Sequence, residues 1–89
     1  MKITFDPAKD AINQAKHGIS LQDAALLDWD SALVDIDSRM DYGEVREIAY
    51  VLRDSRLYIV VFARRDDALR IISLRKANSR EVKYYVDQN

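Results

Sequence analysis

The sequence predicts an α+β fold in which helices accompany a mostly antiparallel sheet. Apolar runs separated by short polar turns follow one another from about residue 44 to residue 76, and strands joined by such short turns must pair antiparallel. An apolar pattern of helical period precedes these runs near the N-terminus, and another follows them near the C-terminus. The predicted architecture is therefore one sheet with two N-terminal helices and one C-terminal helix.

The N-terminal part is predicted to begin with a short strand at residues 2–5. Asp6 is a natural N-cap for a first helix, and Pro7 suits its first position because the N–H that proline lacks would have no partner there. Gly18 is placed to end this helix in a left-handed conformation. Ser20 then begins the second helix as another N-cap.

Four consecutive strands are predicted after these helices. The first is followed by a turn-rich segment, and residues 57–62 are apolar on both faces of the pleat, which favours a central place in the sheet. The predicted strands are residues 32–37, 44–53, 56–64 and 69–76, with the tight turns at 54–55 and 66–67.

The last helix is predicted to begin at Asn78 or Ser79. Its apolar side chains are expected to pack on the sheet, so that the helices lie on one side of it. Tyr84 and Tyr85 are adjacent, so at most one of them can join the core while the other faces a base or a partner. The residues expected to face the sheet are Val82, Tyr85 and Val86.

Length and composition exclude several classes of protein. A chain of 89 residues is one small domain, 1–89, and it has little volume for a deep enclosed pocket. With no cysteine and one histidine, neither a disulfide framework nor a zinc site is expected, and we expect no cofactor. No apolar run approaches the length of a membrane span, and we expect a soluble, cytoplasmic protein.

The charges are unevenly distributed although the net charge is only −1. Residues 20–44 contain seven acidic side chains against one basic side chain, whereas residues 64–83 contain seven basic against three acidic. One end of the molecule is therefore predicted to be cationic and able to attract a polyanion, even though the overall balance argues against a generic nucleic-acid binder.

The most informative segment is the last predicted strand with the turn after it, residues 70–77. It is an apolar strand that ends in two adjacent cations, Arg75 and Lys76, and such a pair suits the binding of a phosphate. The alternation of side chains along a strand then determines which other cations can join this pair.

That alternation places Ile72 and Leu74 on the core side of the strand, together with Arg70. Arg75 then faces outward. Antiparallel pairing across the short turn is expected to place Arg64 on the neighbouring strand beside it.

This group of cations matches phosphodiester cleavage without a metal. Attack of a ribose 2′-hydroxyl on phosphorus needs stabilisation of the developing negative charge, and the forked guanidiniums of Arg75 and Arg64 suit that role. His17 ends a helix whose dipole favours a cation, so it suits a general acid. Glu44 is a candidate base, and Arg46 is expected to lie near it.

Each candidate also has a purely structural interpretation. A histidine just before a helix-ending glycine is often only a cap of the helix. Arg75 and Lys76 can pair with the acidic half of the chain, and Glu44 with Arg46 can form an ion pair of small energetic value.

Three segments of the chain resemble the BrnT toxin family. Residues 5–20 carry an Asp-Pro, a Lys, an Asn and a Lys-His-Gly at the spacing of that family's opening, and residues 43–46 are similar to its Gly-Glu-x-Arg segment. Residues 70–77, Arg-Ile-Ile-Ser-Leu-Arg-Lys-Ala, are similar to its most specific signature. Ala63 and Leu74 depart from the pattern, where a threonine and a small residue are usual.

The resemblance implies a ribonuclease toxin with a RelE-like fold. It also implies RNA as the substrate and an inhibiting BrnA-like antitoxin, through which alone the toxin would contact operator DNA. The candidate catalytic residues are His17, Glu44, Arg64, Arg75 and Tyr84, and the candidate RNA-binding residues are Lys16, Arg46, Lys76 and Arg80.

The functional hypothesis is a metal-independent endoribonuclease toxin of a type II toxin–antitoxin pair that arrests bacterial growth. The alternative is a non-catalytic binding module whose basic face grips an acidic protein partner. A third hypothesis, direct binding of DNA, is disfavoured because no predicted helix carries clustered basic residues.

Overall fold

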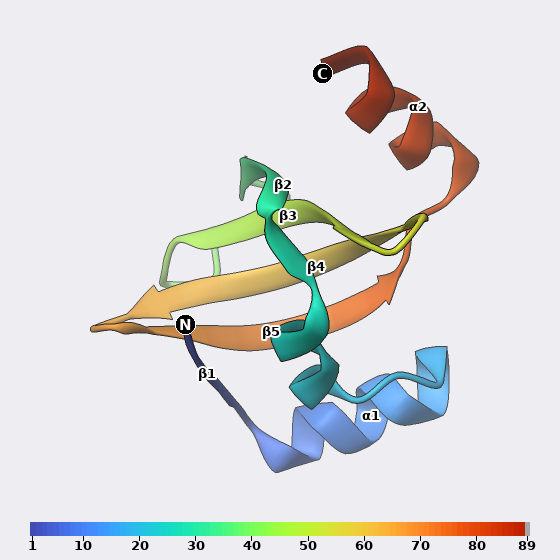
Figure 1. The fold of residues 1–89 in the computed structure, drawn as a ribbon. Helices are drawn as coiled ribbons and strands as arrows, with labels where there is room; N and C mark the ends of the chain where they lie inside the picture. The colour runs from blue at the N-terminus through green and yellow to red at the C-terminus, as the bar shows by residue number, and fades with distance from the viewer. Residues whose placement is uncertain (89) are drawn as a thin grey trace.

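One five-stranded sheet organises the chain (Figure 1). The computed structural model describes residues 1–88, and the last residue of the predicted domain lies outside them. The strand order is β1-β5-β4-β3-β2, with β1 parallel to β5 and every other pair antiparallel, so the predicted α+β class and mostly antiparallel sheet are confirmed. The strands are β1 (Lys2–Phe5), β2 (Asp28–Asp37), β3 (Arg46–Arg53), β4 (Arg56–Arg65) and β5 (Ala68–Lys76).

Helix α1 (Pro7–His17) begins and ends as its sequence signals predict. The side chain of Asp6 accepts a hydrogen bond from the Ala8 N–H at 2.9 Å, which satisfies one of the free donors of the first turn. At the other end Gly18 has φ 69°, and its N–H donates to the Gln14 carbonyl. Any side chain at this position would strain the backbone, so the glycine fixes where α1 stops.

The second predicted helix is a short 3-10 helix, η1 (Leu21–Leu26). Ser20 caps it as predicted, accepting from the Gln22 N–H at 3.2 Å. The indole N–H of Trp29 donates to the Ala24 carbonyl at 2.8 Å, which ties the end of η1 to β2. The prediction that the strand begins at residue 32 was wrong, because β2 begins at Asp28 and carries an irregularity in register before Leu33.

The hydrophobic core lies between η1 and one face of the sheet. Strand β4 is the middle strand, as its apolar sequence predicted, and Phe62 at its centre contacts the edge of the Trp29 ring at 5.7 Å between centroids. Full burial of each large side chain contributes roughly 1.5–3 kcal/mol. The buried core cluster comprises Leu21, Ala24, Leu27, Ala49, Val51, Val60, Phe62, Ile71 and Leu74.

Asn13 of α1 completes the edge of β5 where β1 ends. Strand β1 pairs with β5 only as far as Ile71, so the backbone of β5 beyond that residue has no neighbouring strand on this side. The buried amide of Asn13 donates to the Leu74 carbonyl at 2.8 Å and accepts from the Leu74 N–H at 3.1 Å. A second donation reaches the Ile19 carbonyl at 2.9 Å. One side chain therefore replaces a strand partner and joins α1 to the sheet.

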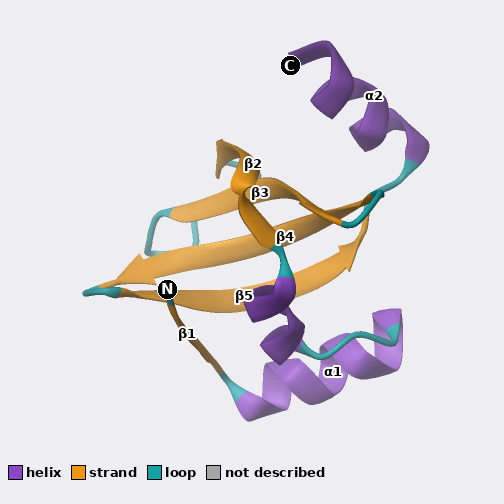
Figure 2. Cartoon of the chain, viewed as in Figure 1, coloured by secondary structure: helices purple, strands orange, loops and turns teal. Residues whose placement is uncertain are grey.

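Helix α2 (Ser79–Gln88) does not pack as predicted. None of its residues is buried, and Val82 and Val86 of the predicted packing face are 41% and 63% exposed. Figures 1 and 2 show α2 standing off one end of the sheet, far from α1 and η1, so the expectation that the helices share one side was wrong. The helix is attached through polar and aromatic contacts with β2, β3 and β5 instead, because its apolar face is too sparse to form a core layer.

No helix within residues 1–88 is long and apolar enough to cross a membrane.

We predict that Asn13→Ala lowers the free energy of unfolding by about 2–3 kcal/mol, because two buried backbone groups of Leu74 lose their partner. The melting temperature should fall by roughly 8–24 °C for a domain of this size, measured by circular dichroism. Gln14→Ala is the control, since it shortens the neighbouring side chain of the same helix and removes only an exposed hydrogen bond to Asp10. An equal melting temperature for both variants would contradict the role assigned to Asn13.

Candidate active site

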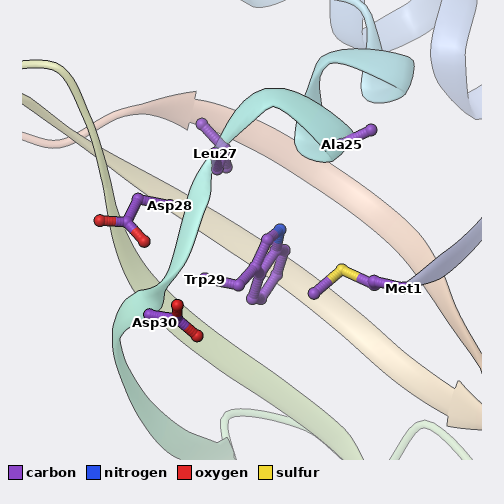
Figure 3. Close-up of a pocket in the computed structure, with 6 residues that line it drawn as sticks. All are labelled: Met1, Ala25, Leu27, Asp28, Trp29 and Asp30. Carbon is purple, nitrogen blue, oxygen red and sulfur yellow. The ribbon is translucent and has the colours of Figure 1, made fainter.

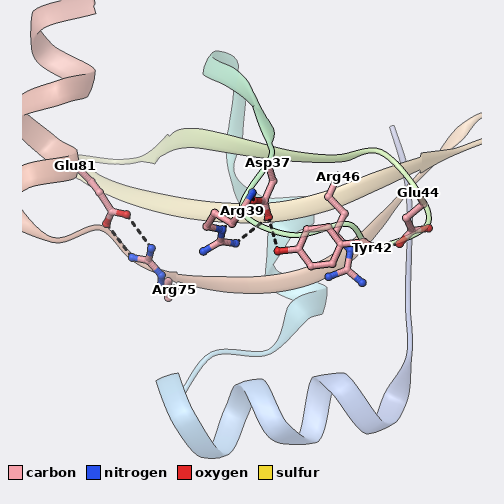
Figure 4. Close-up of polar contacts among 7 residues, drawn as sticks. All are labelled: Asp37, Arg39, Tyr42, Glu44, Arg46, Arg75 and Glu81. Atoms are coloured by element: carbon pink, nitrogen blue, oxygen red, sulfur yellow. Dashed lines mark hydrogen bonds and ion pairs between the residues drawn. The ribbon is translucent and has the colours of Figure 1, made fainter.

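The two faces of the sheet differ in what covers them. Val60 and Phe62 of β4 point to the helical face, where η1 packs, and the alternate residues Ile59, Val61 and Ala63 point to the other face. Arginines from three parts of the chain gather on that second face, which we call the arginine face (Figure 4). It is defined by Arg39, Arg46, Arg70 and Arg75.

A β-bulge in β5 determines which residues reach the arginine face. Val61 pairs with Ser73, but the next residue of β4, Phe62, pairs with Ile71, so Ile72 is an extra residue. The bulge reverses the alternation, and Arg70 therefore shares a face with Arg75. The prediction that Arg70 and Ile72 lie on the core side was wrong, since Ile71 and Leu74 are the buried pair.

Arg75 is held by a two-pronged contact with Glu81 of α2. The Nη1–Oε1 and Nη2–Oε2 distances are 2.8 and 2.7 Å, and the hydrogen bonds with Arg75 are the main cause that lowers the pKa of Glu81. Glu81 is itself fixed by a reciprocal pair with Asn78, which caps α2. The predicted pairing of Arg75 with the acidic half of the chain is not found, because this carboxylate lies closer.

A second group surrounds Glu44 at the opposite end of the arginine face. Its carboxylate contacts the guanidinium of Arg70. It also lies 3.3 Å from Arg46 and 3.8 Å from Arg65. The ring of Tyr42 covers the Arg46 guanidinium at 3.9 Å. The hydrogen bond from Arg70 is the largest cause that lowers the pKa of Glu44. A carboxylate held in this way is a weak proton acceptor, so the geometry does not favour Glu44 as a general base.

Asp37 and Arg39 lie between these two groups (Figure 4). The Asp37 carboxylate is buried and accepts from the backbone N–H, Nε and Nη2 of Arg39, and also from the Tyr42 hydroxyl at 3.2 Å. The side-chain hydrogen bond from Arg39 is the main cause that lowers the pKa of Asp37 to about 2. This arrangement keeps the loop after β2 folded over the sheet.

Tyr84 is the tyrosine of α2 that contacts the arginine face. Its ring lies 5.2 Å from that of Tyr50, and its hydroxyl donates to the Asp35 carboxylate at 3.0 Å. That hydrogen bond is the main cause that raises the pKa of Tyr84, so the phenol is a proton donor at neutral pH. A shallow hollow of about 450 Å³ lies beside it, lined by Tyr50, Asn78, Arg80, Glu81 and Tyr84.

His17 and Lys16 lie at the end of α1, beside the free edge of β5. They line a hollow of about 200 Å³ together with Ser73 and other residues of α1 and β5. Because the side chain of Ser73 points to the same face as Arg75, this hollow borders the arginine face across the β5 edge.

The structure does not bring Arg64 next to Arg75. Arg64 pairs with Leu69 near the β4–β5 turn, whereas Arg75 lies opposite Ile59 near the other end of the hairpin. Arg64 also points to the helical side, where it binds Glu47 at 2.8 Å. Lys76 likewise lies on the helical side, opposite Tyr58. A short turn brings only the residues next to it together, and Arg75 lies too far along β5 from the turn to be opposite Arg64.

Sequence reasoning also missed several residues of the arginine face. A positional signal existed for Glu81, which stands three residues after Asn78 as in a capping box. The position of Arg70 on this face was not predicted because the bulge reverses the alternation, and an apolar strand sequence gives no signal for a bulge. The missed residues are Asp37, Arg39, Tyr42, Tyr50, Arg70 and Glu81.

A further hollow of about 360 Å³ lies beside Trp29, away from these arginines (Figure 3). It is lined by Asp28, Asp30 and apolar side chains and has no basic residue in its wall, which does not suit a phosphate. Within residues 1–88 there is also no cluster of three or more acidic or histidine side chains placed to hold a metal ion.

A family model described as the ribonuclease toxin BrnT of type II toxin–antitoxin systems matches residues 5–81. The matched segment contains the four arginines of the arginine face together with Glu44 and Glu81. No curated protein matches the chain.

We predict that Asp37→Asn destabilises the fold by about 1–3 kcal/mol near neutral pH, because Arg39 and Tyr42 lose an ionised acceptor. The folded-state pKa of Asp37 is below its unfolded value of 3.8, so the contribution is present above that pH and is lost as the pH falls towards 2. Chemical unfolding of both proteins across this range should show the difference shrinking in acid. Asp30→Asn is the control on the same strand, and a pH-independent difference would contradict this assignment.

Proposed function

Because the chain belongs to the BrnT family of ribonuclease toxins of type II toxin–antitoxin systems, we propose that it is an endoribonuclease whose active site is the arginine face. The family implies an RNA target and an antitoxin partner. The observation that carries the proposal is the forked guanidinium of Arg75, held in place by Glu81 beside an open hollow on this face.

Arg75 is proposed to stabilise the transition state. When a ribose 2′-hydroxyl attacks the adjacent phosphorus, negative charge increases on the two non-bridging oxygens, and these have the spacing of a carboxylate. The contact with Glu81 therefore holds the guanidinium in a geometry that a phosphate would use. Exchange of the carboxylate for phosphate costs little, since the side chain of Arg75 is one-third exposed.

Tyr84 and His17 are the proposed proton-transfer groups: Tyr84 gives a proton to the leaving 5′-oxygen, and His17, in place of the acid role that its helix-end position suggested, accepts the proton of the attacking 2′-hydroxyl. The raised pKa of Tyr84 keeps its hydroxyl protonated at neutral pH, so it suits protonation of the leaving 5′-oxygen. His17 lies across the β5 edge beside Ser73, where a strand of RNA passing over this edge would meet it together with Lys16. The proposed contacts with the RNA backbone are Arg46 on the arginine face, Arg80 in the hollow beside Tyr84, and Lys76 on the helical side, which RNA would meet where it passes around the end of β5.

No metal is needed in this mechanism because guanidiniums supply the positive charge. The toxin is proposed to act in the cytoplasm and to adopt the RelE-like arrangement that the family resemblance implies. A BrnA-like antitoxin is proposed to cover the arginine face and to be the only part of the complex that contacts operator DNA.

A second candidate function is a non-catalytic binding module, and the ion pairs between arginines and carboxylates on the arginine face favour it. Arg39, Arg46, Arg70 and Arg75 each already bind a carboxylate of the same chain. A face that takes carboxylates so readily would also suit an acidic segment of a protein partner.

We predict that Arg75→Ala lowers the rate of RNA cleavage by about 10²–10³-fold, the usual cost of losing one donor to a developing oxyanion. Cleavage of a labelled RNA by purified proteins, with melting temperatures measured alongside, tests this. Arg53→Ala is the matched control, since it removes an exposed arginine from the end of β3, on the helical side of the sheet. Wild-type protein that binds an acidic partner through Arg75 but cleaves no RNA would establish the binding module instead.

We also predict that a chelator leaves the cleavage rate unchanged. Protein treated with EDTA and assayed in chelator should cleave RNA as fast as protein supplied with magnesium. Loss of cleavage in chelator, restored by adding a divalent ion, would contradict the metal-independent mechanism.

A further inference from the structure

We infer that the arginine face has a second phosphate site, formed by Arg46, Arg65 and Arg70 around Glu44, which binds an RNA phosphate distant from the one that is cleaved. This inference rests on the RNA-cleaving function proposed above. It concerns a different part of the face from Arg75 and can fail independently of it.

The cluster around Glu44 carries more positive than negative charge. Three guanidiniums surround the single carboxylate of Glu44, which leaves an excess of two positive charges. The neighbouring pair of Arg64 with Glu47 is balanced and does not reduce this excess. A cluster that needed only internal neutrality would contain more acidic side chains, so the surplus favours an added anion.

Arg70 has a buried hydrogen-bond donor without an acceptor. The Nε of Arg70 is buried and has no hydrogen-bond partner, although the same guanidinium binds Glu44 through Nη2. Such a donor costs about 1–3 kcal/mol and is uncommon in native proteins. A ligand with two acceptor oxygens that draws Arg70 away from Glu44 would satisfy more of its donors.

The cluster borders open space, and one of its guanidiniums is already held in place. A hollow of about 410 Å³ opens at this end of the sheet, and its charged lining consists of Glu44, Glu47, Arg64 and Arg65. Arg46 and Arg70 are not in its wall but reach it through their contacts with Glu44. The guanidinium of Arg46 lies against the ring of Tyr42, and its side chain is only 19% exposed, so little side-chain entropy is lost when it binds.

The spacing indicates how this site relates to the catalytic one. Arg70 and Arg75 lie opposite Ala63 and Ile59, which are four residues apart on the regular strand β4, or about 13 Å. This distance exceeds the step between adjacent phosphates of one RNA strand. The two sites therefore hold phosphates that are not adjacent, and Figure 4 shows Arg39 lying between them.

The test is binding of a 2′-O-methyl oligoribonucleotide, which cannot be cleaved, measured by fluorescence anisotropy over a range of salt concentrations. Arg70→Gln should weaken binding about tenfold and lower the slope of log affinity against log salt by about 0.7, the value for one contact to a single strand. Arg65→Gln, at an exposed position, should act in the same direction. Arg53→Gln is the matched control and should change the affinity much less.

Glu44→Gln provides a result that misfolding cannot imitate. Removal of the internal carboxylate should strengthen binding several-fold and steepen the salt dependence, whereas Asp54→Asn in the β3–β4 turn should have a smaller effect. Unchanged binding by both Arg70→Gln and Glu44→Gln would overturn the second site, even if unmodified RNA is still cleaved. Wild-type protein that binds the oligonucleotide without cleaving RNA would overturn the proposed function and leave this site in place.

An acidic protein segment is the rival occupant of this cluster. If the variants bind the oligonucleotide as wild type does but bind poly-glutamate with altered affinity, the cluster belongs to a protein partner, and the inference is wrong.

Discussion

The arginine face depends on how the backbone of β5 is held at its bulge. The extra residue, Ile72, reverses the alternation of side chains, so that Arg70 and Arg75 share a face while Ile71 and Leu74 enter the core. Immediately after the bulge, the amide of Asn13 binds both backbone groups of Leu74. A slip of one residue here would send the arginines to the opposite side, which is why a buried amide at this edge matters to function as well as to stability.

The isolated chain compensates each arginine of this face with its own carboxylates. Glu81, Asp37 and Glu44 hold the guanidiniums in fixed orientations. The pairs made by Glu44 and Glu81 are partly exposed and contribute little net stability, whereas Asp37 is buried. The cations are therefore preorganised before any ligand arrives, and a phosphate replaces a carboxylate of similar shape. The same compensation explains how a protein of net charge −1 can still present a surface suited to a polyanion.

Much of the fold could be predicted from local sequence signals. Asp6, Pro7 and Gly18 set the limits of α1, and the apolar run in β4 indicated the central strand, because capping and burial act over a few residues. The packing of α2 could not be predicted, since the apolar spacing of Val82 and Val86 does not reveal that the face is too small to hold the helix on the sheet. In the candidate site, Arg75 and Tyr84 were identified from the sequence, but Arg70 was not, because its place depends on the bulge and on a contact with Glu44, 26 residues away. Arg39 and Glu81 were also missed, although their partners Asp37 and Arg75 lie two and six residues away in the sequence.

The most direct test of the arginine face is an NMR titration that follows the side-chain Nε–H signals of the arginines and the backbone amide signals as the 2′-O-methyl oligoribonucleotide is added. We expect the Arg75 and Arg70 signals to shift together and to saturate at the same RNA concentration, while the signal of Arg53, which ends β3 on the helical side of the sheet, stays in place. Shifts confined to α1 around Lys16 and His17, with Arg75 unchanged, would place the RNA elsewhere and contradict the account.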